Sequence, residues 1–194
     1  MNKRHFLGTA TLASLFPAVA ASAADKPRRG PGLLTVSGVI DKSNRGPVDP
    51  ALDQLFIKHK VRFDKAYVFD AAALRRLPVV AIRPTLEYDA KPHSLAGPLL
   101  TIVLEAAGVA TSGDFMLSLR AVDGYAVPLS MADIRRYRMI VATEIDGSPL
   151  ALGGLGPQWA VYDADRLAGI KDKPLKERFA PCPWGMFSIE VTRG

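Results

Sequence analysis

Short apolar stretches, separated by glycine- and proline-containing turns, run from residue 33 to the end of the chain. Residues 115–121 alternate apolar and polar side chains, as a half-buried strand does. The Asp123-Gly124 pair that follows is a strong signal for a hairpin turn. The pattern predicts strands at 34–40, 66–69, 79–82, 115–121, 125–129, 139–145, 159–162 and 186–191.

The predicted helices are fewer and shorter than these strands. Asp49-Pro50 opens a helix with Leu52, Leu55 and Phe56 on one side, and Asp70 caps a helix over 71–77. Gly97-Pro98 opens a helix that Gly108 ends, Ser130 begins a capping box, and 175–179 forms one helical turn. Because strands outnumber helices and hairpins are frequent, we predict an α+β fold with mixed, largely antiparallel sheets.

The first 23 residues have the organisation of a signal peptide. Lys3 and Arg4 precede an uncharged run, and Ala21-Ser22-Ala23 is a small-x-small cleavage site. The alternative is a buried N-terminal helix. Because Lys3-Arg4 nearly matches the twin arginine of a twin-arginine signal, export by the general secretory route and by the twin-arginine route both stay open. We expect a signal peptide at 1–23, a flexible lead-in at 24–32, one domain at 33–194, and a periplasmic or secreted protein.

Charge and cysteine content exclude several classes of function. The formal net charge is +6, but the basic residues are scattered and no aromatic residues interleave with them, so nucleic-acid binding is not expected. Cys182 is the single cysteine, which leaves no internal disulfide. His59 and His93 are the only histidines after residue 23, too few ligands for a structural zinc site. No second apolar run is long enough to span a membrane.

Three groups of residues are candidates for chemistry. The glycine-rich segment 152–157 could present N–H groups to an anion, or form a tight turn between strands. The polar segment 83–93, which ends at His93, follows a strand end, where sites are common; an exposed loop histidine is the alternative. Cys182, between two prolines, is either a reactive thiol or a buried apolar side chain. A Gly-x-Ser-x-Gly elbow is absent, so a hydrolase has little support.

The order of motifs over residues 33–192 resembles the oxidoreductase molybdopterin-binding domain, the sulfite-oxidase fold, in its small exported stand-alone form. The resemblance is carried by Ser94-Leu95-Ala96-Gly97-Pro98-Leu99-Leu100, Ala106-Ala107-Gly108-Val109, Asp123-Gly124-Tyr125, Asp146-Gly147-Ser148-Pro149-Leu150, Gly154-Leu155-Gly156-Pro157 and Trp159-Ala160-Val161-Tyr162. It implies an α+β fold with mixed sheets. It also implies molybdopterin as a cofactor and oxygen-atom transfer as the reaction.

The same resemblance places the molybdenum-ligating cysteine of the family just after the strand at 79–82. Here that stretch, 83–89, contains no cysteine, and Cys182 lies far along the chain. Glu87, Tyr88 or Asp89 would be a harder oxygen ligand than a thiolate. The resemblance thus implies the fold while the family's usual metal ligation is missing.

Two functions follow from this departure. The first is a non-catalytic exported module that binds a small molecule or a membrane-bound redox or sensor partner. The second is a molybdopterin-binding oxidoreductase with atypical ligation. In either case the resemblance implies a cleft whose candidate cofactor-binding residues are Arg83, Tyr88, His93, Tyr125, Gly154 and Gly156. Trp159, Tyr162 and Trp184 are candidate aromatic contacts or core residues, and no metal-ligating or catalytic residue is assigned.

Overall fold

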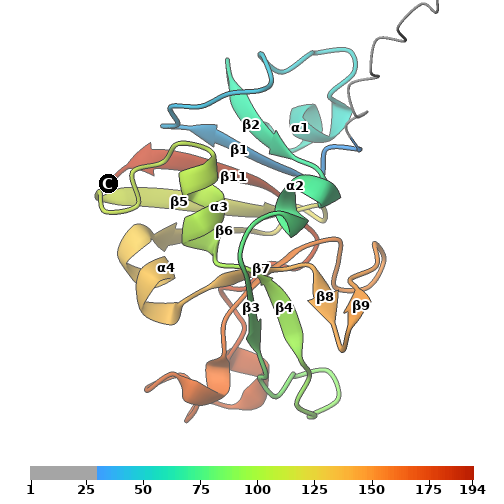
Figure 1. Cartoon of the computed structure of the whole chain (residues 1–194), viewed down its shortest axis with the longest axis vertical. Helices are drawn as coiled ribbons and strands as arrows, with labels where there is room; N and C mark the ends of the chain where they lie inside the picture. The colour runs from blue at the N-terminus through green and yellow to red at the C-terminus, as the bar shows by residue number, and fades with distance from the viewer. Residues whose placement is uncertain (1–29) are drawn as a thin grey trace, which may run out of the picture.

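A computed structural model describes residues 30–194, and the predicted signal peptide and residues 24–29 of the lead-in lie outside the described residues. A five-stranded sheet runs through the domain (Figure 1). Its spatial order is β2 (Ala66–Phe69), β1 (Leu34–Gly38), β11 (Met186–Arg193), β5 (Phe115–Ala121) and β6 (Ala126–Ser130). β1 and β11 are parallel, and the other neighbours are antiparallel.

Two smaller sheets complete the β-structure of the described residues. A four-stranded sheet has the order β3 (Val79–Ile82), β4 (Leu95–Pro98), β8 (Glu144–Ile145) and β9 (Ser148–Pro149), with every pair antiparallel. A two-stranded sheet pairs β7 (Ile140–Ala142) with β10 (Trp159–Val161). The predicted α+β class with mixed, largely antiparallel sheets is confirmed.

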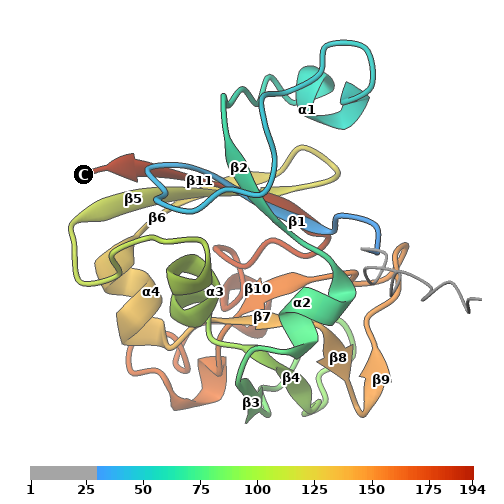
Figure 2. The same cartoon turned by 45° about the horizontal axis from the view of Figure 1, so that its top comes forward.

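The helices are short and cover both faces of the large sheet. α3 (Leu100–Ala106) and α4 (Met131–Tyr137) lie side by side below it, and α1 (Gln54–Lys58) lies above it (Figure 2). α2 (Ala71–Arg75) follows β2, and the 3₁₀ turns η1 (Ala164–Arg166) and η2 (Leu175–Glu177) follow β10. None of the helices in residues 30–194 has the length and apolar character needed to cross a bilayer.

Local sequence signals account for several of these elements. The Asp70 carboxylate accepts a 2.6 Å hydrogen bond from Ala73 N at the start of α2. The Ser130 hydroxyl accepts one of 3.0 Å from Asp133 N at the start of α4. Both bonds satisfy N–H groups that a helix leaves unpaired in its first turn. The predicted caps are therefore confirmed.

Three predicted elements need correction. Gly97 and Pro98 lie in β4 rather than at a helix start, because they pair with Val80 and Val79 of β3. The first helix begins at Gln54 rather than at Asp49-Pro50. Of its predicted apolar side only Phe56 reaches the apolar cluster above the sheet, and Leu52 is 82% exposed. The strand at 79–82 is not buried, since it stands at the edge of its sheet and Val79 is 61% exposed.

Candidate functional site

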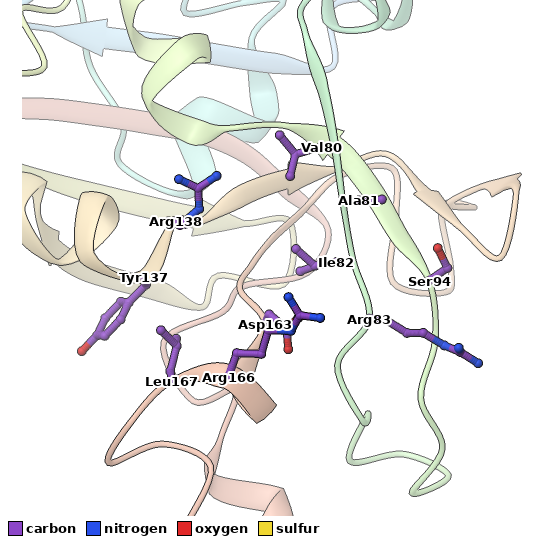
Figure 3. Close-up of a pocket in the computed structure, with 10 residues that line it drawn as sticks. All are labelled: Val80, Ala81, Ile82, Arg83, Ser94, Tyr137, Arg138, Asp163, Arg166 and Leu167. Carbon is purple, nitrogen blue, oxygen red and sulfur yellow. The ribbon is translucent and has the colours of Figure 1, made fainter.

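A cavity of about 460 Å³ lies along β3 (Figure 3). Its opposite wall comes from the end of α4 and from the segment that contains η1. We call this cavity the arginine groove; it is lined by Val80, Ala81, Ile82, Arg83, Ser94, Tyr137, Arg138, Asp163, Arg166 and Leu167. Its volume lies in the range of small-ligand sites.

The β3 wall of the groove is an unpaired sheet edge. The carbonyls of Ser94 and Ala96 accept hydrogen bonds from Asp146 N and Thr143 N, so both point away from β3. Backbone groups alternate in direction along a strand, which leaves the neighbouring residues of β4 to bond with β3. By the observed register, the β3 residues that face β4 are Val80 and Ile82.

Val79 and Ala81 therefore turn their N–H and C=O groups outward. No residue in 30–194 forms a hydrogen bond with these groups. The side chains of Val80 and Ile82 point toward the opposite wall of the groove, whereas Arg83 points away from it (Figure 3). The edge thus offers unpaired backbone groups beside an apolar surface.

The opposite wall is basic. Arg138 ends α4 with a left-handed φ of 49°, is exposed, and forms no ion pair with any residue in 30–194. Arg166 is also exposed, and its Nε lies 3.4 Å from Asp163 Oδ2. The guanidinium groups of Arg138 and Arg166 thus stand beside a single lining carboxylate, that of Asp163. The groove therefore has the electrostatic character of an anion site.

The candidate residues from the sequence fall into separate places. Arg83 lines the arginine groove, and Tyr88 and Tyr125 line a second hollow of about 280 Å³. His93 lies in neither cavity, and Gly154 and Gly156 lie in the loop before β10. The single cleft expected from the resemblance is thus divided among four locations.

The second hollow, which we call the aromatic hollow, is bordered by the exposed rings of Tyr88, Tyr125 and Trp184. Tyr125 donates a 2.6 Å hydrogen bond from its hydroxyl to the carbonyl of Ala180. Cys182 also lines this hollow, although the residue is only 4% exposed. The structure therefore brings the single cysteine close to the loop that follows β3.

The Cys182 thiol lies in an apolar environment. Burial raises its pKa far above the ordinary range, and a hydrogen bond with Tyr162 only partly offsets this effect. The thiol is consequently protonated at neutral pH, and a thiol reacts and binds metals as the thiolate. The geometry supports the interpretation of Cys182 as a buried apolar side chain.

His93 links two segments that are far apart in the sequence. Its Nδ1 lies 2.6 Å from Asp146 Oδ2, in the turn between β8 and β9, and its Nε2 lies 3.0 Å from Asp89 Oδ2. With carboxylates at both nitrogens, only the doubly protonated ring can donate to both. The hydrogen bonds from Asp146 and then Asp89 raise the pKa of His93, and its proximity lowers the pKa of each carboxyl group.

We expect the contact between the β3–β4 loop and the turn between β8 and β9 to depend on pH. Because the pKa of His93 is raised, its stabilising effect is complete below about 6.5, the ordinary histidine value, and is lost as the pH rises through the raised value. An NMR titration of His93 should give a pKa above 6.5, and Asp146→Asn should lower it. Asp64→Asn, outside this contact, should not. A His93 pKa unaffected by Asp146→Asn would contradict the contact.

The glycine-rich loop closes on itself. The N–H groups of Gly154 and Gly156 both donate to the carbonyl of Ala151, at 3.1 and 3.0 Å. A Cβ on Gly156 would lie 2.3 Å from the Leu150 carbonyl oxygen, so this position requires glycine. Neither N–H group is free to bind an anion, and the geometry favours the tight turn.

Sequence reasoning did not identify the basic wall of the groove. Arg138 belongs to the run 135–138, which has the pattern of solvated surface, and Arg166 stands alone in the sequence. Neither carries a motif. Their proximity to β3 depends on the packing of segments some 60 to 80 residues apart, which no local pattern encodes.

Two comparisons with known proteins gave no match: no family model matches the chain, and neither does any curated protein. Among solved structures, the crystal structure of the sulfane dehydrogenase SoxCD from Paracoccus pantotrophus is similar, with 14% sequence identity and a TM-score of 0.51. The match covers 84% of this chain and 38% of that chain. At this identity the likeness shows the fold alone, and it supports the sulfite-oxidase-like α+β fold expected from the sequence.

Proposed function

We propose that this protein is a non-catalytic binding module that takes an anionic ligand in the arginine groove. The carrying observation is a cavity of about 460 Å³ whose basic wall holds Arg138, which forms no ion pair with any residue in 30–194, opposite the edge strand β3. Charge-assisted hydrogen bonds from guanidinium groups are the strong, oriented contacts that an anion site uses. The signal-peptide pattern at 1–23 further supports export. A membrane-bound redox or sensor protein is the partner that we propose for such an exported module.

The described residues do not fit molybdopterin with the family's usual thiolate ligation. The segment after β3 supplies Glu87, Tyr88 and Asp89, whose oxygen atoms are hard ligands. The single thiol, Cys182, is buried and protonated. Within residues 30–194 no group of three or more side chains is arranged to hold a metal ion. These residues therefore support no catalytic step through molybdopterin.

One observation favours the alternative, an oxidoreductase with atypical ligation. Cys182 lines the same aromatic hollow as Glu87 and Tyr88, next to the segment where the family carries its ligand. We expect less than stoichiometric molybdenum and pterin in protein purified from its own host, and the same content in Cys182→Ser. Stoichiometric molybdenum that Cys182→Ser abolishes would replace our proposal with this alternative.

Inorganic pyrophosphate serves as the probe for the arginine groove. We expect it to shift the amide NMR signals of residues 80–83 and to bind about tenfold or more weakly to the double variant Arg138→Gln/Arg166→Gln, because hydrogen bonds to charged groups are lost. Arg193→Gln, an exposed arginine at the end of β11, is the matched control and should bind as the unmodified protein does. Equal binding by all three proteins would contradict the assignment of the site.

A further inference from the structure

We propose that the natural occupant of the arginine groove is an extended acidic segment of a partner protein, which pairs with β3 as an added strand. This inference rests on the proposed function, since it names the ligand of the same site. Strand addition to an exposed sheet edge is a general mode of peptide recognition. The added segment would extend the four-stranded sheet beyond β3, with one of its faces toward the basic wall.

The backbone of β3 is available for this pairing. The outward N–H and C=O groups of Val79 and Ala81 lack hydrogen-bond partners throughout the described part of the chain. Unpaired groups of this kind are a template for another strand. Pro78 and Pro84 bound the edge, and a four-residue strand spans about 13 Å. The structure therefore accommodates a short pairing of about four residues.

Side chains around the edge define the chemistry of the partner segment. The side chains of Val80 and Ile82 point toward the opposite wall, which carries Leu167, Arg138 and Arg166. Side chains of an added strand alternate between faces. Residues of the added strand that share the face of Val80 and Ile82 would point toward this wall, so acidic residues at every second position would place carboxylates against Arg138 and Arg166. The single carboxylate already present, Asp163, leaves this charge unbalanced.

Charge disfavours the two other sources of a strand. Residues 24–29 of the same chain read Ala-Asp-Lys-Pro-Arg-Arg, which is a basic segment. A second copy that paired through β3 would bring a second set of the same arginines toward the first. Both would add positive charge where the groove already has an excess. An acidic segment of a different protein is the occupant that the electrostatics favour.

The test uses a six-residue peptide that alternates glutamate and valine, with blocked ends and a fluorescent label, titrated into the purified protein. We expect binding that shifts the amide signals of residues 79–83 and protects the Val79 and Ala81 amides from hydrogen exchange. An analogue N-methylated at alternate residues keeps every charge but cannot form the ladder. It should bind about tenfold or more weakly. A lysine–valine peptide should not bind.

Each result bears on the proposal separately from the proposed function. Equal binding of the parent and N-methylated peptides would overturn strand addition while leaving an anion site. Pyrophosphate binding without peptide binding would overturn the peptide as occupant. Failure of both probes would overturn the site itself. A dimer that forms as the protein concentration rises and protects the Val79 and Ala81 amides from hydrogen exchange would make a second copy the occupant. Faster exchange of these amides after removal of residues 24–29 would make the chain's own segment the occupant.

Discussion

Replacing Gly97 with alanine is expected to destabilise the protein by about 3 kcal/mol or more, a large part of the stability of a typical domain. Gly97 lies in β4 close to the backbone of β7, and a Cβ there would stand 1.9 Å from the Val141 carbonyl oxygen. The obstacle is backbone, which no change of rotamer can relieve. The strands would have to separate, and β3 and the groove would move with β4.

Urea denaturation followed by circular dichroism measures this loss as a lower midpoint. Gly46→Ala is the matched control, since nothing lies within 4 Å of a Cβ at that position and its backbone is not left-handed. We expect the control to stay within about 0.5 kcal/mol of the unmodified protein. If Gly97→Ala unfolds at the urea midpoint of this control, β4 and β7 do not approach each other as closely at Gly97 as the structure shows.

The elements that the sequence predicted well are those with local causes. The β5–β6 hairpin follows from the alternation over 115–121 and from Asp123-Gly124, and the observed pairing of Leu119 with Val127 makes Val122-Asp123-Gly124 a three-residue turn with a left-handed Gly124. The helices capped by Asp70 and Ser130 follow from side-chain hydrogen bonds to residues three positions ahead. Such interactions depend on neighbours in the sequence, so a single sequence is enough to predict them.

The errors arose where a distant segment decides the outcome. Gly97-Pro98 has the pattern of a helix start, but these residues pair with Val80 and Val79 of β3, which draws them into a sheet. The same reason explains the candidate site. Arg83 was identified because it follows a strand, whereas Arg138 and Arg166 face β3 only through tertiary packing. Tertiary context overrides local preference at such positions.

Trp159→Ala is expected to lower the free energy of unfolding by about 3–5 kcal/mol, the range for removing a large buried aromatic side chain. Trp159 in β10 has 0% exposure and packs against Phe179, with the two rings tilted by 52° and their centroids 5.8 Å apart. Its indole Nε1 also donates a 2.9 Å hydrogen bond to the Cys182 carbonyl. Trp159→Phe should lose about 1–3 kcal/mol, because it fills much of the space but leaves that buried carbonyl unpaired.

Trp184→Ala is the matched control, since Trp184 is 36% exposed and borders the aromatic hollow. We expect a loss of about 1 kcal/mol or less in urea denaturation. The same variants test whether Trp159 keeps the Cys182 thiol buried. The indole of Trp159 bonds to the Cys182 backbone, so the thiol of Trp159→Phe should react faster with a thiol reagent than the thiol of Trp184→Ala. Equal destabilisation by Trp159→Ala and Trp184→Ala, together with equal thiol reactivity of Trp159→Phe and Trp184→Ala, would mean that Trp159 does not keep Cys182 buried. The thiol would then be accessible from the aromatic hollow, and the alternative with a cysteine-ligated metal would regain its main support.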